Sequence, residues 1–127
     1  MSNFTHTHLK DVKDSAPDFG LEGVEARFAT GDLSASDTGV AYQRLDANQR
    51  SGFGHKHENA EEVYVVLSGS GQMKLDDDII DIGPLDAIRV APPVVRAFAA
   101  GDEGLELIAF GPRHEGDGEM VQDWWPA

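Results

Sequence analysis

Hydrophobic and polar positions alternate in short runs along most of this chain, and Gly, Asp and Pro separate the runs. Alternation with a period of two is typical of β-strands, because successive side chains point to opposite faces of a sheet. The pattern predicts strands at residues 24–29, 40–45, 53–57, 62–67, 72–75, 79–82, 86–90, 94–98 and 105–110. No segment shows a persuasive helical period. The sequence therefore predicts an all-β sandwich or barrel.

The length of 127 residues fits a single domain with its own core. We expect residues 1–23 to form an N-terminal arm, residues 24–111 the β-barrel domain, and residues 112–127 a short C-terminal tail. Within the barrel, Ser-Gly-Ser-Gly at residues 68–71 and three Asp at residues 76–78 are expected to be turns.

The predicted strand at residues 62–67, Glu-Val-Tyr-Val-Val-Leu, carries apolar side chains on both faces. Both faces of such a strand are expected to be covered. One face would line the barrel interior, and the other would be covered by the N-terminal arm or by a second subunit. We therefore expect a homodimer.

Composition limits the cell compartment and the classes of partner that we expect for this protein. The chain has no cysteine, which excludes disulfides and thiolate metal sites. It shows no signal-peptide pattern and no apolar run long enough for a membrane span, so we expect a cytoplasmic protein. The 23 acidic and 10 basic residues leave a net charge of −13. A field of that sign repels phosphate, so we expect no nucleic acid and no membrane among its partners.

The clearest candidate chemistry is His55-Lys56-His57 followed by Glu62. Residues i and i+2 of a strand share a face, so His55 and His57 would project together while Lys56 points away. A carboxylate from a neighbouring strand would complete a set of two histidines and one carboxylate, which suits divalent iron and related metals.

The spacing His55-x-His57-x4-Glu62-x6-Gly69 resembles the first motif of the cupins, small jelly-roll β-barrels also called double-stranded β-helices. The stretch at residues 82–98 resembles their second motif. The resemblance covers residues 40–111 and implies a cupin-like double-stranded β-helix. It also implies that His55, His57 and Glu62 correspond to three of the four metal ligands of the family.

The second motif departs from the family pattern. Its glycine, proline and second glycine are replaced by Leu85, Ala91 and Pro93, and its metal-binding histidine by Arg96. Arginine stays protonated and offers no lone pair to a metal. At about 4 Å from a cation it would add about 4 kcal/mol of repulsion per unit charge at an effective dielectric of 20.

Three arrangements of Arg96 remain open at this point. It could repel the metal from the site, it could pair with Glu62 and leave a metal-free pocket for an anion, or it could turn toward a substrate carboxylate beside a retained metal. His114 could also replace the missing fourth ligand, although a histidine there is more often a surface residue.

Aromatic residues complete the candidate site. Tyr64, Phe53 and Phe98 are expected to line the pocket and bind the ligand together with Arg96, although core packing explains the aromatic residues equally well. Trp124 and Trp125 need burial, either across the barrel mouth or on a partner subunit.

The sequence supports two functions of different kinds. The first is a cupin that binds a small molecule in the barrel with a divalent metal, Fe, Mn, Zn or Ni, held by His55, His57 and Glu62; its activity is unassigned. The alternative is a metal-free, non-catalytic module that binds a small anionic or sugar-like ligand through Arg96. A purely structural role ranks third. Whether the protein is an enzyme is left open by the sequence.

Overall fold

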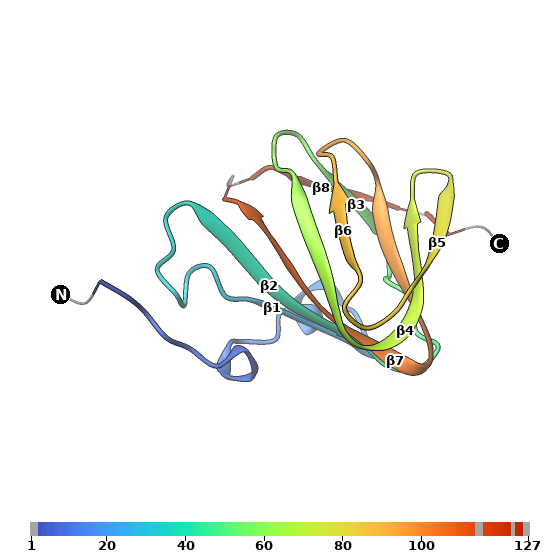
Figure 1. The fold of residues 1–127 in the computed structure, drawn as a ribbon, viewed down its shortest axis with the longest axis horizontal. Helices are drawn as coiled ribbons and strands as arrows, with labels where there is room; N and C mark the ends of the chain where they lie inside the picture. The colour runs from blue at the N-terminus through green and yellow to red at the C-terminus, as the bar shows by residue number, and fades with distance from the viewer. Residues whose placement is uncertain (1–2, 114–115, 123, 126–127) are drawn as a thin grey trace.

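The computed structural model describes residues 3–113, 116–122 and 124–125, and these form a curled, antiparallel β-barrel (Figure 1). Eight strands account for most of it, and two short 3-10 helices precede them. The helices are Leu9–Asp11 (η1) and Ala16–Phe19 (η2). The strands are Val24–Phe28 (β1), Thr38–Leu45 (β2), Gly54–His57 (β3), Glu62–Leu75 (β4), Asp78–Ile82 (β5), Ala87–Val90 (β6), Arg96–Pro112 (β7) and Gly118–Val121 (β8). The all-β prediction is confirmed.

The two long strands, β4 and β7, form the framework of the barrel. All pairings are antiparallel. Five strands pair in the order β1-β2-β7-β3-β8, and β4 joins them by pairing with β7 and also pairs with β5 and β6. The first half of β7 pairs with the second half of β4, and the second half of β7 pairs with the first half of β4. Of the short strands, β3 pairs with the start of β7 and β6 pairs with the start of β4.

Residues 68–71 do not form the predicted turn. They lie inside β4, where the register against β7 shifts twice, between Val66 and Ser68 and between Gly69 and Gly71. Gly69 has a φ of +80°. A Cβ on it would lie 2.1 Å from the carbonyl oxygen of Gly104, so glycine serves a bulge and a close approach of two backbones here. The strands predicted at 94–98 and 105–110 are likewise joined in β7.

Apolar side chains of β2, β4, β6 and β7 fill the barrel interior. Tyr64 and Val66 point inward from β4, and cross-strand neighbours on β7 meet them. The buried cluster consists of Leu45, Tyr64, Val66, Met73, Ile82, Val90, Phe98, Ala100, Leu105, Leu107 and Ala109. This alternation of inward apolar positions follows the period-two pattern of the sequence.

The N-terminal arm packs against the outer side of β1 and β2. Val12 and Ala16 are buried, and the backbones of Asp14 and Arg27 form an isolated antiparallel β-bridge. The Lys10 ammonium lies 4.6 Å from the centre of the Tyr42 ring. On the outer side of β4, by contrast, Val63 and Val65 are half-buried and Leu67 is exposed. The homodimer expected from these residues stays a prediction.

The C-terminal segment adds a strand that the sequence did not predict. β8 pairs with β3, with Gly118 opposite His57 and Met120 opposite His55. The tryptophans that follow dock on the barrel: the Trp125 indole donates to Ser51 O at 2.9 Å, and the Lys74 ammonium lies 3.3 Å from the centre of the Trp124 ring.

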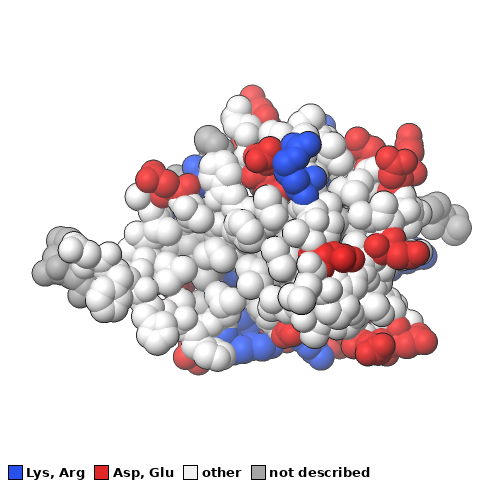
Figure 2. All heavy atoms as spheres, viewed as in Figure 1, with Lys and Arg blue, Asp and Glu red and all other residues white. Residues whose placement is uncertain are grey.

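Acidic residues outnumber basic ones, 23 to 10. Figure 2 shows them gathered mainly over the end that carries β4 and β5, and the face shown has no broad basic patch. Among the described residues, no helix is both long enough and apolar enough to pass through a bilayer.

The close approach of β4 and β7 predicts that Gly71→Ala destabilises the barrel. A Cβ at Gly71 would lie 2.1 Å from Ala99 O, so the backbones must separate. We expect a loss of about 1–3 kcal/mol in the free energy of unfolding, measured in urea. Gly83→Ala, where a Cβ meets nothing within 4 Å, is the control and should change it by less than about 0.5 kcal/mol. Equal effects would contradict the interpretation.

Candidate metal centre

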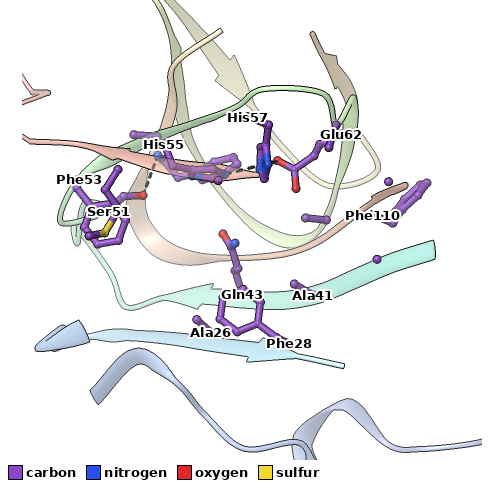
Figure 3. Close-up of a pocket in the computed structure, with 18 of the residues that line it drawn as sticks. Ala26, Phe28, Ala41, Gln43, Ser51, Phe53, His55, His57, Glu62 and Phe110 are labelled. Carbon is purple, nitrogen blue, oxygen red and sulfur yellow. Dashed lines mark hydrogen bonds and ion pairs between the residues drawn. The ribbon is translucent and has the colours of Figure 1, made fainter. Parts of the chain in front are cut away.

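The two histidines share one face of β3, as their spacing predicts. β3 is held between β7, where His55 lies opposite Arg96, and β8, where His57 lies opposite Gly118. The His55 and His57 rings meet edge to face, with centroids 5.4 Å apart. Figure 3 shows both rings beside Glu62 on one wall of a cavity.

Glu62, the first residue of β4, brings one carboxylate oxygen close to both rings. Its Oε1 lies 3.1 Å from His57 Nε2 and 3.5 Å from His55 Nε2. Glu61, the neighbouring carboxylate, points outward and pairs with Arg89 at 3.1 Å. The structure therefore joins Glu62, and not Glu61, to the histidines.

Two further side chains bind the same Glu62 oxygen. The Tyr64 hydroxyl donates to Oε1 at 2.6 Å and lies 3.2 Å from His55 Nε2. The Arg96 guanidinium donates to Oε1 at 2.9 Å and, through its other terminal nitrogen, to Ala91 O at 2.8 Å. Of the arrangements left open by the sequence, the structure shows direct pairing of Arg96 with Glu62.

These contacts determine the charge state of the site. Burial alone would raise the pKa of Glu62, but the adjacent His55 and His57 rings and the hydrogen bond from Tyr64 hold it well below its usual range. The Glu62 carboxylate raises the pKa of His57, while burial and Arg96 lower it. Burial, together with the Glu62 charge, raises the pKa of Tyr64. Glu62 is therefore an ionised carboxylate beside a neutral phenol.

The donor set fits a divalent metal. One ligand atom from each of His55, His57 and Glu62 lies within 4.8 Å of the other two. Two ligands at right angles on one first-row ion, each at about 2.1 Å, stand about 3 Å apart, close to the separations found here. His57 Nε2 is buried and, despite its short distance to Glu62, is not aligned to form a hydrogen bond. A buried nitrogen lone pair without a partner is what a metal ligand requires.

The cavity beside the site has a volume of about 430 Å³ and is mainly apolar. Phe53 and Phe98 line it, and their contact with a ligand stays a prediction. Tyr64 and Arg96 are not among its lining residues, because their side chains are 1% and 0% exposed and reach Glu62 from behind the wall. Across the cavity, Gln43 projects its amide from β2 toward the histidines (Figure 3).

Solved structures share this architecture, although no family model and no curated protein matches the sequence. A cupin protein from Bacteroides fragilis has a TM-score of 0.73 and 20% identity, over 91% of this chain and 89% of its own. The polyketide cyclase RemF from Streptomyces resistomycificus has a TM-score of 0.74 and 20% identity, over 99% and 88%. The chain has the cupin fold.

A larger enzyme contains the same barrel as one part. Oxalate decarboxylase from Bacillus subtilis has a TM-score of 0.79 and 21% identity over 98% of this chain, which spans 33% of that enzyme. Identities near one fifth show a shared fold. The chemistry of this cupin barrel therefore has to be argued from its own residues.

Sequence reasoning found the histidines and the carboxylate but missed two polar residues of the site. Asp117, next to β8, places its carboxylate Oδ2 3.4 Å from His57 Nδ1, and Gln43 faces the triad. Neither lies in a recognisable motif, although Gln43 alternates with Ala41 and Leu45 at an inward position of β2. His114, considered as a fourth ligand, lies outside the described residues.

The pairing of Glu62 predicts a pH-dependent contribution to stability. Because its folded-state pKa lies below the unfolded-state value of about 4.3, ionised Glu62 stabilises the fold above that pH, and the stabilisation is lost as pH falls toward the folded-state pKa. In EDTA, Glu62→Gln should therefore lower the free energy of unfolding at pH 7 by about 3 kcal/mol, since it leaves Arg96 unpaired. The deficit should shrink below about pH 4.

Glu61→Gln is the matched control, because Glu61 is an exposed carboxylate one residue away. Its effect should stay within about 0.5 kcal/mol at both pH values. A Glu62→Gln deficit that is the same at both pH values would contradict a lowered pKa for Glu62.

Proposed function

We propose that this protein binds a divalent metal ion through His55, His57 and Glu62, and that the ion contacts a small molecule held in the barrel cavity. The observation that carries the proposal is the convergence of three ligand atoms on the cavity wall, one of them a buried nitrogen without a hydrogen bond. Nitrogen and oxygen donors of this kind suit Fe, Mn, Zn and Ni.

The chain's own groups define what such a site can do. When bound, the ion would supply Lewis acidity to a carbonyl or hydroxyl oxygen of the ligand. Arg96 and Tyr64 hold the Glu62 carboxylate in one orientation through bonds of 2.9 and 2.6 Å. The mainly apolar wall offers few polar groups that compete with the contacts made at the site.

The cavity favours a neutral, mainly apolar ligand with an oxygen atom for the site. Small side chains, among them Ala26, Ala41 and Ala109, widen the barrel between β1, β2 and β7. The side-chain amide of Gln43 projects into the cavity, where it can reach a second polar group of the ligand. RemF, a polyketide cyclase with this fold, supports a ligand of that kind.

Metal analysis tests the proposal. Wild-type protein, purified without a metal-affinity tag and dialysed, should carry about one equivalent of metal, and His57→Ala or Glu62→Gln should carry less than about a tenth. EDTA should lower the melting temperature of the wild type but not that of His57→Ala or Glu62→Gln, since metal bound to the folded state stabilises it. Glu61→Gln should keep its metal. Wild-type protein that neither carries metal nor gains stability from added Fe, Mn, Zn or Ni would overturn the proposal.

A second function rests on the contact between Arg96 and Glu62. At 2.9 Å the guanidinium already satisfies the carboxylate, so the site is electrically balanced without a metal. In this alternative the barrel is a metal-free, non-catalytic module, and an anionic or sugar-like ligand draws Arg96 away from Glu62. The complete burial of Arg96 and its bonds to Ala91 and Pro92 oppose that movement.

Substitution of Arg96 separates the two functions. If the triad binds metal, Arg96→Gln should tighten Mn²⁺ or Ni²⁺ binding because it removes a repelling charge. Arg96→His should tighten it further, by about tenfold or more, because it also adds a ligand. In the metal-free alternative, benzoate should raise the melting temperature of EDTA-treated wild type, and Arg96→Gln should abolish the rise. If both Arg96 variants fold and bind metal with the affinity of the wild type, the result would contradict the metal-binding function.

A further inference from the structure

Phenylalanine side chains are concentrated around the cavity. Of the six phenylalanines in the chain, five line it: Phe19, Phe28, Phe53, Phe98 and Phe110. Phe98 is buried in the core, whereas Phe19 and Phe28 are still 49% and 50% exposed. Single exposed apolar side chains are common on protein surfaces, but several that share one cavity indicate a surface that a ligand covers.

Phe53 stands in one row with the two histidines. Residues 53, 55 and 57 alternate with residues 54 and 56, so their side chains share one face of β3 and of the residue before it. Packing on the other face agrees with this alternation, since a Cβ on Gly54 would lie 2.8 Å from Trp124 Cγ. Each step of two residues along a strand is about 6–7 Å, so Phe53 lies one such step beyond His55 along the wall (Figure 3).

Small side chains form much of the opposite wall of the cavity. Ala41 on β2 lies opposite Ala109 on β7, and both line the cavity. Ala26 on β1 lies opposite Gln43 on β2, and Figure 3 shows both across the cavity from the histidines. Each alanine presents a single methyl group, so this wall is level apart from the Gln43 amide. With a volume of about 430 Å³, the cavity has the size of a small-molecule site, and its shape suits a thin, planar ligand.

We propose that the ligand of this cavity is a planar aromatic compound of two or three fused rings with a hydroxyl or carbonyl oxygen at one end. Its oxygen lies at the triad, and its far ring packs on Phe53. Phe19, whose ring centroid lies 6.4 Å from that of Phe53, brings a second aromatic ring from the N-terminal arm to the same end. Aromatic rings in tilted or offset contact attract each other beyond the burial of their area. The position of the oxygen rests on the proposed function; the preference for an aromatic ring does not.

Two probes separate recognition of an aromatic ring from simple burial of apolar surface. 2-Naphthol and decahydro-2-naphthol share one skeleton and one hydroxyl group, but only the first is planar and aromatic. Burial alone favours the saturated alcohol, because its apolar surface is larger. In EDTA-treated wild type at pH 7, calorimetry should show 2-naphthol binding about tenfold more tightly than decahydro-2-naphthol. Equal affinities, or tighter binding of the saturated alcohol, would overturn the proposal without any variant being needed.

Phe53→Leu tests where the far ring binds. Leucine keeps an apolar side chain but removes the aromatic ring, so the preference for 2-naphthol should fall to about threefold or less. Phe53→Tyr should retain the preference, and Phe19→Leu should lower it by a smaller amount. Phe4→Leu is the matched control, since Phe4 is 77% exposed and is not among the residues that line the cavity. If Phe53→Leu discriminates between the probes as strongly as Phe4→Leu, the assignment of Phe53 is wrong.

Manganese distinguishes a failure of this inference from a failure of the proposed function. If the ligand oxygen contacts a metal held by the triad, Mn²⁺ should tighten the binding of 2-naphthol by about tenfold. The affinity for naphthalene, which has no oxygen, should change by less than about twofold. A preference for 2-naphthol that Mn²⁺ does not strengthen would leave the aromatic site in place and overturn the proposed contact between metal and ligand. Bound Mn²⁺ without any preference for 2-naphthol would overturn the aromatic ligand and leave the metal site.

Discussion

The Glu62 carboxylate is the group on which the rest of the site depends, because a single oxygen of it serves four side chains. Tyr64 and Arg96 donate to Oε1 at 2.6 and 2.9 Å, and the Nε2 atoms of His57 and His55 lie 3.1 and 3.5 Å away. A partly buried carboxylate stays ionised only where donors or cations surround it. Arg96 therefore does not merely replace a ligand of the family pattern. It donates a hydrogen bond to the same carboxylate oxygen that faces both histidines.

The barrel makes this arrangement possible through two long strands. β4 carries Glu62 and Tyr64 at its start, whereas Arg96 begins β7 opposite Leu75 of β4 and His55 of β3. The curl of the barrel therefore brings the arginine to the carboxylate, and direct pairing with Glu62 does not. Glycines at the bulges of β4 let the backbones of the two strands approach, which curls the sheet around the apolar cavity. Tyr64 packs on Phe98 with ring centroids 5.2 Å apart, which links the polar site to the core.

Polar groups come to the site from both ends of the barrel sequence. β8 places Asp117 behind His57, and β2 places Gln43 across the cavity (Figure 3). The site thus has a charged side, formed by Glu62, Arg96 and Asp117, and an apolar side with one amide. This asymmetry favours a ligand that offers an oxygen to the metal and a hydrocarbon surface to the remaining walls.

The sequence by itself determined the properties that depend on local spacing. The period of two predicted the strands, and the spacing from His55 to Gly69 indicated the fold and the three side chains that converge in the structure. It was wrong about residues 68–71, because glycine suits a bulge as well as a turn and only the partner strand decides between them. The tertiary structure alone decided that Arg96 pairs with Glu62 and that Asp117 approaches His57. The first contact joins residues that are 34 positions apart and the second joins residues that are 60 positions apart. The alternation within a single strand does not predict contacts over such separations.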